Sequence, residues 1–359
     1  MRELRSIAYT LIAAAALVAC DRSEPFAPEA GSEPLVALSA VTAAPGGLFF
    51  YNDGGLTRRL PESPCRGATP HRDFEFWVGE WAVFNPAGTR VGTNVIRSLL
   101  DGCLVEENWT SAGGGQGRSM NAYDAATDTW SQYWIDQFGL HLRLEGGLVD
   151  GKMVLQGERL FNPTLPVIDR IMWTELPNGD VNQFWDLSVD GGQTFPFVLF
   201  NGTYVLTPGV QPAPPAMTSF CAAPEYRRLD FLEGNWTVST ASGVEAGAAS
   251  VVIDLQGCLI EADLETRKGY ASQSFFGYDA TTGSWYRNYM DSEGIRLVMV
   301  GGFDGDALVL EGQRPGSGGT LHVRVTIEEE APGHVVERWE TSEDGGEWKP
   351  GATVVLDAV

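Results

Sequence analysis

Positive charge is scarce in this chain of 359 residues. It has 24 lysines and arginines against 47 aspartates and glutamates, a formal net charge of −23. A surface of that sign repels a phosphate backbone, and no cluster of Lys and Arg with interleaved aromatic residues occurs, so we expect no nucleic-acid partner. Long apolar runs are missing as well, because no stretch reaches the roughly 20 apolar residues that a membrane-spanning helix needs.

The sequence also has little with which to bind a metal or to carry out nucleophilic catalysis. It has only 4 histidines, and none of them is spaced for paired ligation. No Gly-x-Ser-x-Gly elbow is present. We therefore expect no metal and no cofactor, and an enzymatic role is the least favoured hypothesis.

The N-terminus has the layout of an export signal. Arg2 and Arg5 precede an apolar run at residues 7–18, which is too short to span a membrane. Cys20 follows a small residue at the end of this run and resembles the lipobox cysteine of bacterial lipoproteins. The resemblance implies cleavage before Cys20, lipid attachment there, and a place in the bacterial cell envelope, facing the periplasm; the choice of membrane stays open. The alternative is an ordinary signal peptide with an incidental cysteine.

Residues 76–147 return at a constant offset of 155 positions, with 23 of the 72 positions identical. The register has no gap, as expected for two copies of one folding unit, because an insertion within paired strands would turn every later side chain to the other face. The period is far longer than that of a solenoid repeat, so each copy should be a complete domain. We expect few contacts between the two copies.

Composition places the boundaries of these domains. We expect a signal peptide at 1–19, a tether at 20–60, a first domain at 61–207, a Pro-rich linker at 208–220 and a second domain at 221–359. The mature protein would then be attached to the membrane only through its lipid.

The remaining four cysteines follow the repeat. Cys103 and Cys258 coincide in register, while Cys65 and Cys221 each lie near the start of a copy. In an exported chain this pattern predicts one disulfide per domain, Cys65–Cys103 and Cys221–Cys258. The alternative is four free buried thiols.

Each copy reads as a series of short strands. The segments are rich in aromatic and β-branched residues, several alternate between apolar and polar residues, and no convincing amphipathic helix occurs. Turn pairs suited to positive φ separate them, such as Asp150-Gly151, Asp304-Gly305 and Asp344-Gly345. About nine or ten sequential strands per copy predict an all-β protein of two tandem antiparallel up-and-down barrels. A sandwich is the alternative.

The repeated motif is Phe-x-x-Gly-x-Trp, then Gly-Cys-x-x-Glu, then Tyr-Asp. It resembles a family of exported bacterial lipocalin-like (calycin) domains, present here as a tandem pair. The resemblance covers nearly all of each copy and implies that Trp81 and Trp236 close the barrel floors. The chain lacks the Thr-Asp-Tyr element of true lipocalins.

Glu106 and Glu261 occupy the Glu position of Gly-Cys-x-x-Glu, on the strand face opposite the apolar residues. A glutamate that lined the barrel would bind a ligand or act as an acid or base with a raised pKa. One that faced water would only be solvated surface, and this second interpretation is the favoured one.

Four aromatic residues are further candidates for ligand binding. Tyr123 and Tyr278 are each followed by an aspartate at a strand end, which suits either a pocket wall or a structural hydrogen bond beside the turn. Trp134 aligns with Tyr289, a difference that would give the two interiors different pockets.

Three hypotheses follow. The leading one is a lipid-anchored envelope protein that binds a small, largely hydrophobic ligand in one or both barrels. The second is a non-catalytic interaction or structural module with filled barrels. The third is an enzyme that uses Glu106 or Glu261 as acid or base.

Overall fold

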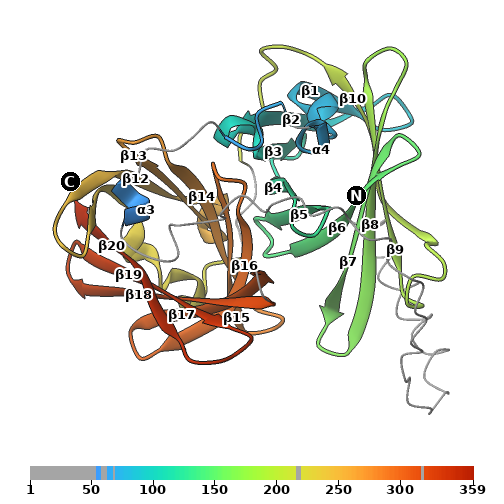
Figure 1. Cartoon of the computed structure of the whole chain (residues 1–359). Coiled ribbons are helices and arrows are strands. Elements are labelled where there is room, and N and C mark those ends of the chain that lie inside the picture. The colour runs from blue at the N-terminus through green and yellow to red at the C-terminus, as the bar shows by residue number, and fades with distance from the viewer. Residues whose placement is uncertain (1–53, 58–62, 68, 216–219, 317–318) are drawn as a thin grey trace.

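The computed structural model describes residues 54–57, 63–67, 69–215, 220–316 and 319–359. The signal peptide, Cys20 and nearly all of the expected tether lie outside these residues. Within them the protein is all-β, and its strands form two closed antiparallel barrels that lie side by side (Figure 1). Each barrel has ten strands, and neighbours in sequence are neighbours in the sheet, so the predicted pair of up-and-down barrels is confirmed.

The first barrel closes by pairing β1 with β10. Its strands are β1 (Gly79–Phe84), β2 (Arg90–Leu99), β3 (Leu104–Ser111), β4 (Gln116–Asp124), β5 (Thr129–Asp136), β6 (His141–Val149), β7 (Lys152–Asn162), β8 (Leu165–Glu175), β9 (Val181–Ser188) and β10 (Phe197–Leu206).

The second barrel closes by pairing β11 with β20. Its strands are β11 (Gly234–Thr240), β12 (Glu245–Asp254), β13 (Leu259–Thr266), β14 (Ala271–Asp279), β15 (Ser284–Asp291), β16 (Arg296–Asp304), β17 (Ala307–Pro315), β18 (Thr320–Ala331), β19 (His334–Glu343) and β20 (Lys349–Ala358).

Helices are few and short among the residues that the structure describes. They are α3 (Gly54–Thr57), α4 (Thr69–Arg72), and the 3-10 turns η1 (Glu75–Trp77), η2 (Leu100–Gly102), η3 (Pro224–Arg227), η4 (Asp230–Leu232) and η5 (Leu255–Gly257). Leu56 of α3, a residue of the expected tether, is fully buried and belongs to the core of the second barrel.

The hairpin turns have the chemistry that the sequence suggests. Asp150 and Gly151 have φ values of 50° and 76°, and they join β6 to β7. Two successive residues with positive φ give the turn a twist that matches the twist of paired strands. Such short connections let each strand pair with the next one along the chain.

Both predicted disulfides are present. Cys65 is bonded to Cys103 and Cys221 to Cys258, with Cα–Cα distances of 5.1 and 5.0 Å. Each bond fixes the segment that leads into a barrel to the start of the third strand of that barrel.

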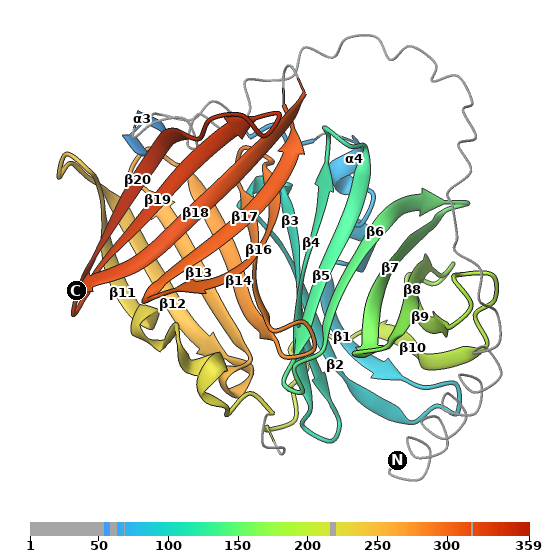
Figure 2. The ribbon, with the colours of Figure 1, turned by 90° about the horizontal axis from the view of Figure 1, so that it is seen from below.

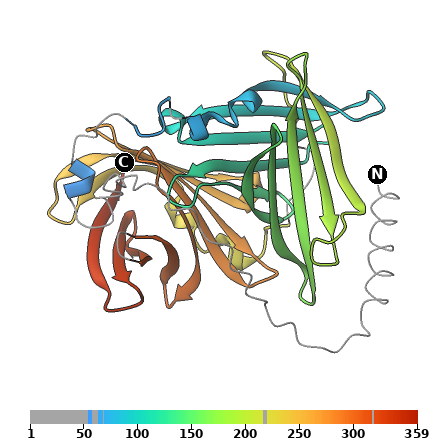
Figure 3. The same cartoon turned by 45° about the vertical axis from the view of Figure 1, so that its right-hand side comes forward.

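The two barrels share an apolar interface, which differs from the expectation of few contacts between the copies. Buried residues from both barrels form one cluster: Cys65, Cys103, Leu104, Met120, Ala122, Tyr133, Ile135, Cys221, Tyr226, Leu255, Cys258, Leu259, Phe275 and Met290. Leu104 is equivalent to Leu259, Met120 to Phe275 and Ile135 to Met290. The outer face of β3, β4 and β5 therefore packs against the equivalent face of the other copy, which is formed by β13, β14 and β15 (Figures 2 and 3).

Candidate functional site

The interior of the first barrel contains a buried polar cluster. Alternation along β3 turns Val105, Glu107 and Trp109 inward, and the Glu107 side chain is buried among polar neighbours from the adjacent strands. Its carboxylate accepts hydrogen bonds from Asn94 Nδ2 of β2 and Ser119 Oγ of β4, both at 2.7 Å. A carboxylate is thus held by donors on both sides, deep in the barrel.

Further amides extend this cluster around the barrel. Asn121 Nδ2 donates to the Val105 carbonyl and to Ser119 Oγ, both at 2.9 Å, and Gln132 Nε2 lies 3.3 Å from Ser119 Oγ. On the opposite side, the Tyr204 hydroxyl of β10 donates to Gln183 of β9. Asn94 Nδ2 also approaches the Tyr204 hydroxyl, at 3.4 Å.

Four polar atoms of this cluster are buried without a hydrogen-bond partner: Asn94 Oδ1, Asn121 Oδ1, Gln132 Oε1 and Trp134 Nε1. In the same barrel, the indole nitrogens of Trp77 and Trp173 are also buried without a partner. The two asparagine amides are oriented by their partners, because Asn94 Nδ2 meets a carboxylate and Asn121 Nδ2 meets a carbonyl, and both partners only accept. Their free atoms are therefore acceptors. Buried polar atoms are nearly always satisfied in native proteins, by water if by nothing else, so each needs an occupant.

Burial also controls the charge of Glu107. Loss of hydration raises the pKa of this carboxyl to about 7, against the lowering effect of its bonds to Ser119 and Asn94 and of the positive charge on Arg118. The group therefore changes its protonation state near neutral pH. Together with the two free asparagine oxygens, it makes the surroundings of Glu107 rich in acceptors, whereas the unpartnered Trp134 Nε1 is a donor.

Two aromatic layers lie on either side of the polar cluster. At the end where the chain enters the barrel, Phe74 and Trp77 of the η1 segment pack on Trp173 with ring centroids 5.0 and 5.3 Å apart. Trp81 belongs to the same buried group, and its Nε1 donates to the Trp77 carbonyl at 2.9 Å. The opposite end has large rings that are only partly buried: Trp109, Trp134, Trp185 and Phe200.

The second barrel repeats the scaffold and changes the interior. Trp236 Nε1 donates to the Leu232 carbonyl at 2.8 Å, as Trp81 does to its counterpart. Ala262 stands where the first copy has Glu107, and Ala249 where it has Asn94. Gln132 is replaced by Arg287, which pairs with the buried Glu337.

The polar groups of the second interior satisfy one another. Arg287 Nε donates to Ser274 Oγ at 3.0 Å, and the Tyr289 hydroxyl lies 3.2 Å from Asp291 Oδ2. Tyr270 also donates to Asp291 at 3.1 Å, and burial raises the pKa of that carboxyl to about 7. Among the described residues, no inward-facing strand residue of this barrel has a buried polar atom without a partner. The two copies thus differ in whether their interior polar groups are satisfied.

Glu106 and Glu261 lie neither in a barrel interior nor in open solvent. Alternation places both on the outer faces of their strands, as the sequence predicts, but these outer faces meet at the interface between the barrels. Gln273 Nε2 donates to Glu106 Oε1 at 3.1 Å and to Glu261 Oε1 at 2.9 Å. The interpretation of these residues as solvated surface is therefore wrong for Glu106, whose exposed fraction is 5%.

The candidate aromatic residues have separate environments. Tyr123 is part of the first core, and its hydroxyl donates to Asp128 in the following turn at 2.5 Å, which is the structural hydrogen bond considered above. The Tyr278 ring contacts that of Tyr226 at the interface, with a centroid distance of 5.1 Å. Trp134 and Tyr289 both point inward, in different barrels. The structure therefore brings only Trp134 of these residues to the polar cluster of the first barrel.

Sequence reasoning missed Glu107, Asn94, Asn121 and Gln183. A signal for Glu107 exists, because it lies between Val105 and Trp109 on a face that is otherwise apolar. The amides carry no such signal, since they are recognised only once neighbouring strands are in register.

The described part of the chain contains neither a cluster of metal-ligating side chains nor a helix that could span a membrane. No group of three or more His, Cys, Asp or Glu side chains there could hold a metal ion. No helix there is long and apolar enough to cross a membrane.

Comparison with protein-family models and with curated proteins gives no match. Among solved structures, the chain is similar to a protein of unknown function from the DUF3598 family of Nostoc punctiforme. The match has 12% sequence identity, covers 81% of this chain and 100% of the other, and has a TM-score of 0.18. So low a similarity carries no argument about function, which must come from the site.

Proposed function

We propose that this protein binds a small, largely apolar molecule in its first barrel, as a calycin-like binding protein of the bacterial envelope. The observation that supports the proposal is the contrast between the two interiors. The first has four buried polar atoms without partners around Glu107, whereas the polar groups of the second are paired with one another. The barrel fold does not itself require unpartnered polar atoms in its interior, because the second copy forms the same barrel without them.

The acceptor atoms beside Glu107 define one end of the ligand. Asn94 Oδ1, Asn121 Oδ1 and the Glu107 carboxylate all accept, so the end of the ligand near them carries donors, an amine or a hydroxyl. The partly buried rings of Trp109, Trp134 and Phe200 suit an apolar body. The ligand class is therefore an amphipathic amine or alcohol, and an acid of the same length should be rejected.

Tryptophan fluorescence tests this directly. We would titrate the protein with decylamine, decanol and decanoic acid, and expect the first two to change the emission and the acid to have no effect. Glu107→Gln should weaken decylamine binding by about tenfold or more, since a charge-assisted hydrogen bond is lost. Tyr289→Phe, in the second barrel, is the matched control and should have no effect. Equal binding of all three compounds, or loss of binding in the control alone, would refute the proposal.

We also propose that the protein is exported and anchored by lipid at Cys20. Supporting this are the charged start, the short apolar run and the small residue before Cys20. The two disulfides are consistent with an oxidising compartment. Mass spectrometry of the mature N-terminus should find a lipidated Cys20, and Cys20→Ser should release the protein into the soluble fraction. An unmodified residue 20 in membrane-free protein would contradict this assignment.

A further inference from the structure

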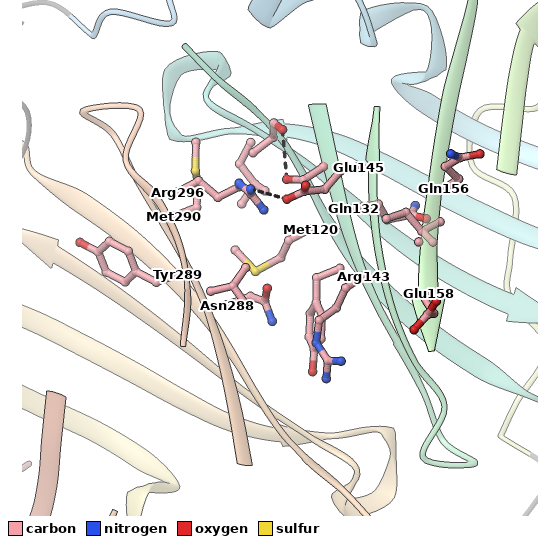
Figure 4. Close-up of a pocket in the computed structure, with 17 residues that line it drawn as sticks. Met120, Gln132, Arg143, Glu145, Gln156, Glu158, Asn288, Tyr289, Met290 and Arg296 are labelled. Carbon is pink, nitrogen blue, oxygen red and sulfur yellow. Dashed lines mark hydrogen bonds and ion pairs between the residues drawn. The ribbon is translucent and has the colours of Figure 1, made fainter. Parts of the chain in front are cut away.

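A cavity of about 350 Å³ lies between the two barrels, outside both interiors. Its walls come from β3, β4, β5, β6 and β7 of the first barrel and β15 and β16 of the second (Figure 4). It adjoins a second hollow of about 460 Å³, which shares Glu145, Arg296 and Val298 with it. Apolar side chains, among them Met120 and Met290, form much of the wall.

Four donor atoms on this wall are buried and have no hydrogen-bond partner. They are Arg143 Nε, Arg143 Nη2, Asn288 Nδ2 and Arg296 Nε. Asn288 is 6% exposed, so its amide is almost wholly removed from water. Gln132 also borders the cavity, but its amide is directed to Ser119 inside the first barrel.

Contacts hold both arginine side chains in place, but each guanidinium has at least one N–H group without a hydrogen-bond partner. The Arg143 guanidinium lies over the Tyr286 ring, 3.4 Å from its centroid, and its Nη2 is 3.9 Å from Asp279 Oδ2, which is too long for a hydrogen bond. Arg296 Nη2 pairs with Glu145 at 2.8 Å, which leaves its Nε free. Figure 4 shows Arg143 and the Arg296–Glu145 pair on either side of Met120.

We propose that this cavity binds a small organic anion. Its acid group would accept from the free edges of Arg143 and Arg296 and from the Asn288 amide, and its apolar body would lie against Met120 and Met290. Carboxylate, sulfonate and phosphate share this chemistry, since each presents several acceptors to a guanidinium. A cation is disfavoured because the unpartnered atoms of these three residues are all donors.

The site requires both barrels, and its donor set occurs once in the described part of the chain. Arg143 aligns with Val298 in the second copy, and Arg296 aligns with His141 in the first. His141 is fully engaged at the related position, with Nδ1 2.7 Å from the Tyr133 hydroxyl and Nε2 3.2 Å from the Tyr278 carbonyl. The repeat therefore does not create a second copy of the donor set.

Two dyes of matched shape test the proposal. The first is 8-anilino-1-naphthalenesulfonate, and the second is N-phenyl-1-naphthylamine, which has the same rings without the sulfonate. We expect one sulfonate dye per chain, with Arg143→Gln and Arg296→Gln each weakening it by about tenfold or more. Asn288→Asp, which keeps the shape and turns a donor into an acceptor, should weaken it as well. Binding of the uncharged dye should not change in these variants.

Controls separate this site from the first-barrel interior. Arg267→Gln removes an exposed arginine that does not line the cavity and should leave the sulfonate dye unaffected. Glu107→Gln should weaken decylamine and not the dye, whereas Arg143→Gln should do the reverse. Circular dichroism would verify the fold of each variant. The proposal would be overturned if the affinity for the sulfonate dye were unchanged in all three cavity variants. It would also be overturned if the two dyes bound with the same affinity to the native protein and to every variant.

Discussion

Glu106 and Glu261, which occupy equivalent positions in the two copies, accept hydrogen bonds from one and the same amide, Gln273 Nε2. The same nitrogen, which carries two hydrogens, also lies 3.1 Å from Asp263 Oδ1. Three carboxylates therefore converge on a single neutral donor at the interface between the barrels. Burial and the nearby charge of Glu106 raise the pKa of Glu261 to about 8.

This arrangement predicts an interface that weakens as the solution becomes more alkaline. The folded pKa of Glu261 is above its ordinary value of 4.5, so folding takes up a proton between those two pH values. The free energy of unfolding should therefore fall as pH rises from about 4.5 to about 8, by at most about 1.4 kcal/mol per pH unit for one group. Urea unfolding from pH 5 to 9 measures this slope.

Glu261→Gln should flatten the profile and gain stability relative to the native protein at pH 8. Glu265→Gln, an exposed residue on the same strand, is the control and should keep the native slope. Glu107 and Asp291 contribute in the same direction, so the decisive quantity is the difference between native protein and variant. An unchanged slope in Glu261→Gln would argue against a shared proton at this position.

The shared apolar face predicts that the separated barrels bind each other. Fragments 61–207 and 221–359 should each close a barrel but expose Leu104 or Leu259, both fully buried in the whole protein. Mixed in equal amounts, they should sediment as a one-to-one complex, and each alone should self-associate through the same face. Leu259→Asp should abolish the complex. Fragments that stay monomeric in the mixture would show that the interface contributes little.

Each disulfide should contribute similarly to stability. The closed loops span 38 and 37 residues, for which restriction of the unfolded chain gives about 4 kcal/mol. Replacing Cys65 and Cys103 together by Ala, or Cys221 and Cys258 together, should lower the free energy of unfolding by about that amount. Chemical denaturation gives the value, and a loss below about 1 kcal/mol in either pair would contradict the entropic explanation.

The buried Arg287–Glu337 pair predicts that replacing one partner lowers stability far more than replacing both. Arg287→Met leaves Glu337 buried without its partner and should cost about 3–5 kcal/mol, whereas Met at both positions should cost far less. Arg324→Met, which breaks a pair with the half-exposed Glu311, should cost under about 1 kcal/mol. Thermal and urea unfolding of the four proteins would measure these differences.

Ligand binding in the first barrel should depend on pH through Glu107. Its pKa of about 7 means that the carboxyl is mostly ionised only above neutral pH. Decylamine, a cation below about pH 10, should bind about tenfold more weakly for each pH unit below 7, while decanol should show no such change. Glu107→Gln should remove the dependence. An identical profile for amine and alcohol would exclude Glu107 as the contact.

Strand number, barrel topology and both disulfides could be predicted from the sequence because each depends on local information or on the repeat. Alternating apolar residues and positive-φ turns specify sequential hairpins, and the internal repeat constrains which cysteines pair. The same alternation correctly placed Glu106 opposite Val105. It could not say what covers that outer face, because this depends on contacts between the two copies, such as that of Gln273 with Glu106, 167 positions apart in sequence.

The interior site was harder to predict for a related reason. Whether Asn94 and Asn121 face a partner or leave an acceptor free depends on strand register around the barrel. The cavity with Arg143 and Arg296 is even harder to predict from the sequence. Its walls belong to different copies, and it exists only after the two barrels have docked.

The docking of equivalent faces has a consequence for how the protein can change. A lone barrel with this face would pair with its twin, and every substitution would then alter both partners at once. Linked in one polypeptide, the halves keep a fixed one-to-one stoichiometry and accept mutations independently. Glu107 and Ala262 illustrate such a difference, since one copy has an ionisable group where the other has a methyl group. The two non-identical domains therefore dock as the subunits of a heterodimer would, but they belong to one polypeptide.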